Sequence, residues 1–119
     1  MGIAAMHALI IEADAIVALA IEDALRDFGF SSFAFATTHG EAVAAAEERC
    51  PDLITADVEL NVGCGITAVQ RICADKVVPV VFVSEATREI ERRLPAAIAV
   101  RKPFPSAALA EAVAQARAA

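Results

Sequence analysis

Five polar residues in this 119-residue sequence carry the groups that phosphoryl chemistry uses. Glu12, Asp14 and Asp57 supply carboxylates, Ser84 supplies a hydroxyl and Lys102 supplies an ammonium group. Crowded carboxylates repel one another, and a divalent cation that prefers oxygen ligands, such as Mg²⁺, is the usual way to stabilise them. A phosphoryl group fits between such a cation and a lysine, and an aspartate can attack phosphorus to form an acyl phosphate.

These residues follow short apolar segments that are typical of strands in a parallel sheet. We expect five strands, at residues 7–11, 32–37, 53–56, 78–83 and 97–100. Most of these segments are apolar throughout instead of alternating with polar residues, which predicts strands that are covered on both faces.

Amphipathic segments that predict helices lie between the expected strands. We expect helices at residues 17–28, 38–49, 66–73 and 87–94, and a last one from residue 106 onward. Gly29 supplies a stop for the first helix, and Thr38 with Glu41 forms a capping box at the start of the second. The fourth helix is short and charged, and Pro95 ends it.

Five strand–helix units predict a doubly wound α/β fold, a (βα)5 sandwich with a five-stranded parallel sheet. Each parallel connection needs a crossover, and the expected helices supply one for every pair of strands. A chain of 119 residues fits a single domain, which we assign to residues 1–119. Ligand sites in such sheets lie at the carboxyl ends of the strands, where the five polar residues occur.

Composition and charge exclude several other classes of protein. Hydrophobic residues make up 58% of the chain and charged residues 22%, which excludes a disordered chain. A net charge of −6 argues against binding to nucleic acid or to an anionic membrane. Cys50, Cys64 and Cys73 have no metal-ligand spacing and indicate a reducing compartment. With no apolar run of membrane-spanning length and no basic signal region, we expect a cytoplasmic protein.

Several sequence fragments together resemble the response-regulator receiver domain of two-component signalling. They are Leu9–Glu12, Asp52–Asp57, Gly65, Val81–Ser84 and Lys102–Phe104. They occur in the family's order and cover essentially the whole chain. The resemblance implies strand order 2-1-3-4-5, with a fourth helix that is shortened here. It also implies a regulatory phosphoacceptor that is no enzyme beyond its own phosphotransfer and dephosphorylation.

The resemblance also implies a role for each matching site residue. Asp57 would accept the phosphoryl group from a histidine kinase or a histidine phosphotransfer protein. Ser84 would be the switch hydroxyl, and Lys102 would contact the phosphoryl oxygens. Mg²⁺ would be held by Glu12 through water, by Asp57 and by the backbone carbonyl of Glu59. The side chain of Glu59 is more simply a solvated loop residue than a further ligand.

Three departures from the family pattern affect these expectations. Ala13 stands where the family has its direct metal ligand, so we expect weak Mg²⁺ binding. Asp14 lies one residue later, and we favour a role as the N-cap of the first helix over that of a displaced ligand. Ala99 replaces the aromatic switch residue, and the segment between Ser84 and Lys102 is shorter than usual.

Two functions remain open, and a third is disfavoured. The retained Asp57, Ser84 and Lys102 favour a phosphorylation switch whose output partner is unknown. Ala13 favours the alternative, a degenerate receiver that binds partners without phosphorylation. Flavin electron transfer on the same architecture would need a phosphate-binding loop after the first strand, where Glu12 and its neighbours would repel a phosphate.

Overall fold

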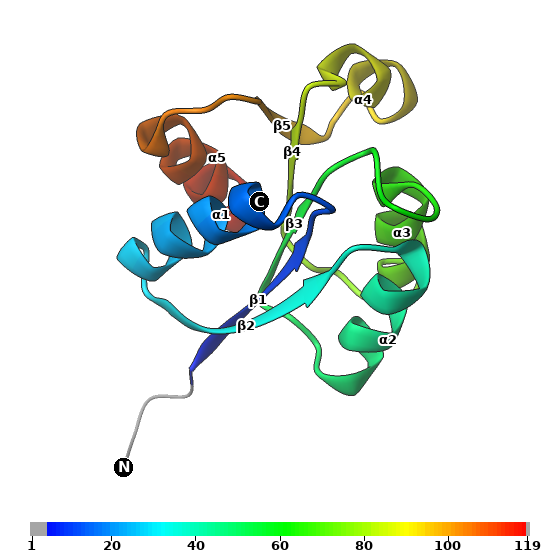
Figure 1. The fold of residues 1–119 in the computed structure, drawn as a ribbon, viewed down its shortest axis with the longest axis horizontal. Coiled ribbons are helices and arrows are strands. Elements are labelled where there is room, and N and C mark those ends of the chain that lie inside the picture. Colours follow the sequence, from blue (N-terminus) through cyan, green and yellow to red (C-terminus); the bar gives the residue numbers. More distant parts are fainter. Residues whose placement is uncertain (1–4, 119) are drawn as a thin grey trace.

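The computed structural model describes residues 5–118, in which strands and helices alternate along the chain (Figure 1). The strands are β1 (Met6–Ile11), β2 (Phe30–Ala36), β3 (Leu53–Ala56), β4 (Val80–Ser84) and β5 (Ile98–Arg101). The helices are α1 (Ala15–Asp27), α2 (His39–Glu48), α3 (Gly65–Ile72), α4 (Thr87–Arg93) and α5 (Ser106–Ala118). All ten predicted elements are confirmed. The single domain over 1–119 stays a prediction, and its residues 1–4 and 119 lie outside the described ones.

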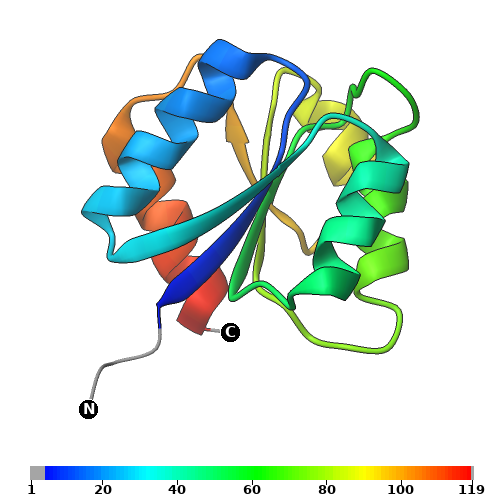
Figure 2. The same cartoon turned by 60° about the horizontal axis from the view of Figure 1, so that its bottom comes forward.

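The five strands form one parallel sheet in the order β2-β1-β3-β4-β5, as predicted. Helices α1 and α5 lie on one face of the sheet, and α2 and α3 lie on the other (Figure 2). Because all pairings are parallel, the carboxyl ends of the strands meet at a single edge of the sheet.

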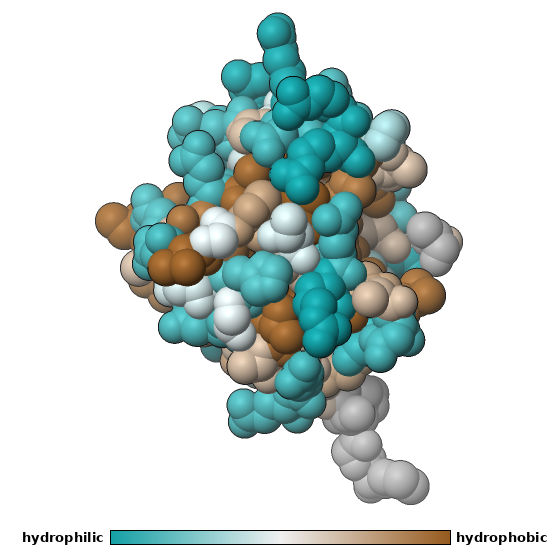
Figure 3. Space-filling model, turned by 90° about the vertical axis from the view of Figure 1, so that its right-hand side faces the viewer, coloured by the Kyte–Doolittle hydropathy of each residue, from teal (hydrophilic) through white to brown (hydrophobic). Residues whose placement is uncertain are grey.

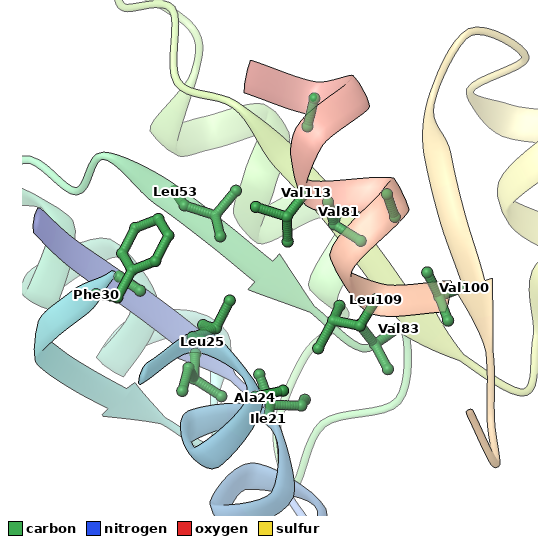
Figure 4. Packing of buried hydrophobic residues seen from close by; sticks show 14 of the residues in the cluster. Ile21, Ala24, Leu25, Phe30, Leu53, Val81, Val83, Val100, Leu109 and Val113 are labelled. Carbon is green, nitrogen blue, oxygen red and sulfur yellow. The ribbon is translucent and has the colours of Figure 1, made fainter. Parts of the chain in front are cut away.

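Two apolar clusters fill the space between the sheet and its two helical layers. Residues that alternate along a strand belong to different clusters: Ala8 and Ile10 pack with α1 and α5, whereas Leu9 and Ile11 pack with α2 and α3. Figure 4 shows the first cluster, in which Leu25, Leu109 and Val113 approach the sheet. Burial on both faces is the reason why the strand segments are apolar throughout.

Two strands begin two residues away from the predicted start, whereas β1 and β5 each differ by one residue. β2 begins at Phe30, two residues early, because this ring is only 2% exposed and belongs to the core while its backbone pairs with Met6. β4 begins at Val80, two residues late. Pro79 directly before it lacks an N–H and contributes only its carbonyl, which accepts from Ile54 at 2.9 Å.

The fourth helix is short, as expected. α4 has seven residues, and Ile90 is the residue that it buries. An apolar groove of about 550 Å³ lies between α3 and the end of α4, where Val69, Phe82 and Leu94 contribute to its lining. The side of the molecule with α2, α3 and α4 shows separate apolar patches among polar side chains (Figure 3). None of the helices within residues 5–118 has both the length and the apolar character needed to cross a membrane.

Candidate functional site

The carboxyl edge of the sheet brings four of the predicted site residues together. Glu12, Asp57 and Lys102 come directly after β1, β3 and β5, and Ser84 is the last residue of β4. Asp57, Ser84 and Lys102 line one pocket of about 280 Å³. The remaining lining residues are Glu59, Glu85 and Ala86.

The Lys102 ammonium group lies between two carboxylates. Its Nζ is 2.7 Å from Glu12 Oε1 and 2.8 Å from Asp57 Oδ2. The side chain of Glu12 is 2% exposed, that of Asp57 12% and that of Lys102 13%. The two nearly buried carboxylates of Glu12 and Asp57 therefore share the single positive charge of Lys102.

The other two carboxylate oxygens accept hydrogen bonds from the backbone. Asp14 N–H donates to Glu12 Oε2 at 3.1 Å, and Val58 N–H donates to Asp57 Oδ1 at 2.7 Å. Three of these four carboxylate oxygens thus accept a hydrogen bond. The buried Glu12 Oε1 has the ion-pair contact with Lys102 but no hydrogen-bond partner among the described residues.

The pKa values of Glu12 and Lys102 reflect their burial and their contacts within the site. Burial raises the pKa of Glu12, and the contact with Lys102 and the hydrogen bond from the Asp14 backbone N–H offset this only in part. Burial lowers the pKa of Lys102, but its contacts with the Asp57 and Glu12 carboxylates outweigh this effect, and the net pKa is raised. Lys102 is therefore a permanent cation at neutral pH.

Ser84 connects the site to α4. Its side chain is buried, and its Oγ accepts a hydrogen bond from Ala86 N–H at 3.0 Å. The backbone carbonyl of Ser84 accepts from Lys102 N–H at 3.1 Å, which holds the ends of β4 and β5 together. A movement of the Ser84 hydroxyl would therefore change a hydrogen bond at the start of α4.

Asp14 and Glu59 lie at the edge of the site. Asp14 caps α1, because its Oδ1 accepts from the N–H groups of Ile16 at 2.9 Å and Val17 at 3.3 Å. The predicted N-cap is thus confirmed, and one oxygen of this exposed carboxylate is committed to the helix. Glu59 is exposed in the loop after β3, which agrees with a solvated side chain at the mouth of the pocket.

The residues of this site fit a tightly bound Mg²⁺ poorly. Ala13 offers no side-chain oxygen, and Lys102 already neutralises part of the charge on both Glu12 and Asp57. Within residues 5–118, His, Cys, Asp and Glu form no group of three or more that could hold a metal ion. Mg²⁺ binds through oxygen ligands in near-octahedral geometry, and two carboxylates occupied by an ammonium do not provide this.

Gly65 is a residue of the site that the sequence analysis noted only as part of a motif. A Cβ at this position would lie 1.6 Å from the backbone oxygen of Asp57. The Gly65 N–H donates to the carbonyl of Val58 at 2.9 Å, so α3 begins directly against the loop that carries Asp57. Only glycine allows this approach. Glu85 and Ala86 were also missed, although they follow Ser84 directly in the sequence.

Comparison with known proteins identifies the family. The model of the response regulator receiver domain matches residues 8–114. The chain belongs to this family. It is 33% identical over 117 residues to the Phyllosphere-induced regulator PhyR of Methylorubrum extorquens, a match that covers 94% of this chain and 43% of that protein. The resemblance and fold class predicted from the sequence are thus confirmed.

Two further similarities concern an enzyme and a solved receiver. The chain is 44% identical over 69 residues to the protein-glutamate methylesterase/protein-glutamine glutaminase of Haloarcula marismortui, which covers 58% of this chain and 19% of that protein. The receiver domain of a sensor histidine kinase from Pseudomonas aeruginosa PAO1, with a magnesium ion in its active-site cleft, superimposes with a TM-score of 0.82. That receiver is 25% identical, with 98% of this chain and 100% of the other covered. The chain spans less than half the length of the curated relatives that it matches.

Proposed function

We propose that this receiver domain accepts a phosphoryl group on Asp57 from a histidine kinase or a histidine phosphotransfer protein, and that phosphorylation switches its partner binding. The observation that carries the proposal is the position of the Asp57 carboxylate. It lies in a pocket that it shares with Ser84, and it forms an ion pair with Lys102 at 2.8 Å. The role is regulatory, and we extend no methylesterase activity to these residues.

The chemistry of the transfer follows from these three side chains. A carboxylate oxygen of Asp57 forms a bond to phosphorus while the bond to the donor imidazole nitrogen breaks. Lys102 then moves its hydrogen bond from Asp57 Oδ2 to a phosphoryl oxygen, and the Ser84 hydroxyl donates to another. Glu12, Asp57 and the Glu59 carbonyl are the groups that would bind Mg²⁺. We propose that this binding is weak because Ala13 supplies no ligand.

The output of the switch is proposed to run through α4 and its flanking residues. If the Ser84 hydroxyl turns to the phosphoryl group, it weakens its hydrogen bond with Ala86 N–H, which now measures 3.0 Å. Ala99 is exposed and has no ring that could follow the hydroxyl inward. Because α4 buries little beyond Ile90, the segment at residues 85–95 has low local stability and can rearrange.

A test of the proposed function compares the wild type with two aspartate variants. The protein is incubated with acetyl phosphate and Mg²⁺, and its intact mass is measured. We expect the wild type and the exposed-site control Asp27→Asn to gain one phosphate each, and Asp57→Asn to gain none. Acid-labile phosphate on Asp57→Asn would contradict the assignment.

The alternative is a degenerate receiver that binds its partners without phosphorylation, and Ala13 is the feature that favours it. A wild type that gains no phosphate would support this alternative. The output can be followed by hydrogen exchange with and without beryllofluoride. Changes confined to α1 that spare residues 85–95 would exclude the proposed route through α4.

A further inference from the structure

We propose that Asp57 is phosphorylated without a divalent cation, because Lys102, positioned by Glu12, supplies the positive charge that the reaction needs. This inference rests on the proposed function. It departs from the metal site that the family resemblance implies, and it starts from the poor fit of Mg²⁺ to the residues present.

The charge of the site favours a reaction without a metal ion. Lys102 contacts two carboxylates, those of Glu12 and Asp57, and Ala13 adds no third. A third carboxylate would be a metal ligand, but it would also repel an incoming phosphoryl group. Its replacement by alanine therefore removes the ligand together with part of the repulsion that makes a cation necessary.

Glu12 can hold Lys102 in place while Asp57 reacts. During phosphorylation the ammonium group loses its contact with Asp57 Oδ2, but its 2.7 Å contact with Glu12 Oε1 can persist. Glu12 is itself fixed, because its other oxygen accepts from Asp14 N–H and its side chain is 2% exposed. Asp14 is in turn held as the cap of α1. Glu12 is thus a positioning residue that keeps a cation at the reacting group, where a preorganised charge is most effective.

The proposed step balances without an added co-reactant when acetyl phosphate is the donor. A carboxylate oxygen of Asp57 forms the new bond to phosphorus, and the bond from phosphorus to the acetyl oxygen breaks. The electron pair of that bond leaves with acetate. No proton is transferred, and Lys102 remains protonated and exchanges a carboxylate oxygen for a phosphoryl oxygen.

The decisive experiment measures the rate of phosphorylation by acetyl phosphate in excess EDTA and in saturating Mg²⁺, with intact mass as the readout. We expect the two rates to agree within about threefold, because a fixed charge already stabilises the transferred group. A rate that falls more than about tenfold in EDTA would overturn this inference and leave the proposed function intact. Absence of phosphate under both conditions would overturn both.

Three variants test the role of Glu12. Glu12→Gln should lower the rate in EDTA by about tenfold or more, since Lys102 loses its anchor. Glu12→Asp, which keeps the charge, should retain more activity than Glu12→Gln. The exposed control Glu111→Gln makes the same chemical change on α5 and should behave as the wild type. A Glu12→Gln protein that reacts in EDTA like the wild type would overturn the positioning role.

The variant Ala13→Asp tests the same inference without disturbing Glu12. It places a carboxylate beside the site, so that the charge of Lys102 alone no longer offsets the repulsion of the incoming phosphoryl group. We expect its reaction to depend on Mg²⁺ and to be slower than the wild type in EDTA. Rates of Ala13→Asp that are equal with and without Mg²⁺ and equal to those of the wild type would overturn the charge argument.

Discussion

The two ends of the sheet both carry polar clusters, but they are built differently. At the carboxyl end, Lys102 holds two carboxylates beside a pocket. At the amino end, His7 Nδ1 lies 2.8 Å from Ser32 Oγ, which also accepts from the Arg49 guanidinium at 2.8 Å. Asp52 Oδ2 accepts from the backbone N–H of His7 at 2.7 Å.

The hydrogen bonds of the amino-end cluster are compatible with a neutral histidine. Arginine can only donate, so the Ser32 oxygen accepts from Arg49 and its own proton is available for His7 Nδ1. A neutral His7 with its proton on Nε2 would accept a hydrogen bond from this proton at Nδ1. Burial and the nearby Arg49 lower the pKa of His7, in agreement with this assignment.

The two clusters differ in how their charged groups are satisfied. In the amino-end cluster the hydrogen-bonding groups satisfy one another, and the charged Arg49 is exposed. In the carboxyl-end cluster, two nearly buried anions share one cation, whose contact with Asp57 Oδ2 would break in the proposed phosphorylation. The polar residues at the two ends of β1 therefore differ in setting, and only those at the carboxyl end are proposed to take part in chemistry.

The largest expected effect is on stability, at the carboxyl end. Lys102→Met would leave Glu12 and Asp57 without their common cation, and breaking such a pair should lower the free energy of unfolding by about 3 kcal/mol. Urea unfolding at neutral pH measures this, and the same substitution at the partly exposed Lys76, away from the site, should leave stability unchanged. Adding Glu12→Gln and Asp57→Asn to Lys102→Met should restore most of the loss, and failure to do so would show that packing and not charge holds the site.

The next largest effect is expected on the affinity for Mg²⁺ at the carboxyl end of the sheet. Ala13→Asp should bind Mg²⁺ at least about tenfold more tightly than the wild type, because it regains a carboxylate ligand. Calorimetric titration of both proteins is the measurement, and Ala20→Asp on the exposed side of α1 controls for the added charge. Equal affinities would show that Asp14 or Glu59 already replaces the missing acid.

A smaller effect is expected at the amino end. Ser32→Ala removes the hydroxyl that joins His7 to Arg49 and should lower the free energy of unfolding by about 1 kcal/mol. The phosphorylation rate should stay unchanged, since the cluster lies at the opposite edge of the sheet. Ser31→Ala, at the exposed neighbouring position, is the matched control. A change in phosphorylation rate would show that the two ends are coupled.

The smallest effect is a pH dependence that belongs to His7. Its pKa is lowered in the folded state, so below about pH 6.5 the unfolded chain binds the proton more readily. The stability that the neutral histidine contributes is complete above that pH and is lost as the pH falls toward the folded pKa. Unfolding curves from pH 7.5 to 5.5 should thus decline for the wild type and decline less for His7→Gln. Parallel curves would assign the dependence to other groups.

Much of the fold could be predicted from the sequence because its signals are local. Apolar runs marked the strands, and Asp14 and Thr38 were expected to cap α1 and α2. Both do so, with Thr38 Oγ1 accepting from Glu41 N–H at 3.0 Å. The exact start of β2 at Phe30 was missed, because it depends on packing in the core and not on a local pattern.

The contacts within the site could be predicted only in part. Its residue types were evident at the strand ends, but the pairing of Glu12 with Lys102 joins residues far apart in the sequence and depends on how the sheet places β1 and β5. The amino-end cluster was missed for the same reason. His7 lies in the first predicted strand, but its partners Ser32 and Arg49 come from other parts of the chain, so that no local pattern reveals them.

The contact between Gly65 and the backbone of Asp57 has a consequence for how substitution data on this domain would be interpreted. Any side chain at position 65 would collide with the Asp57 carbonyl and shift the loop that presents its carboxylate. In a selection for signalling, position 65 would therefore tolerate replacement as poorly as position 57. A map of intolerant positions would then rank a residue without any reactive group beside the proposed phosphoacceptor, Asp57. Only a measurement of folding would separate the two positions.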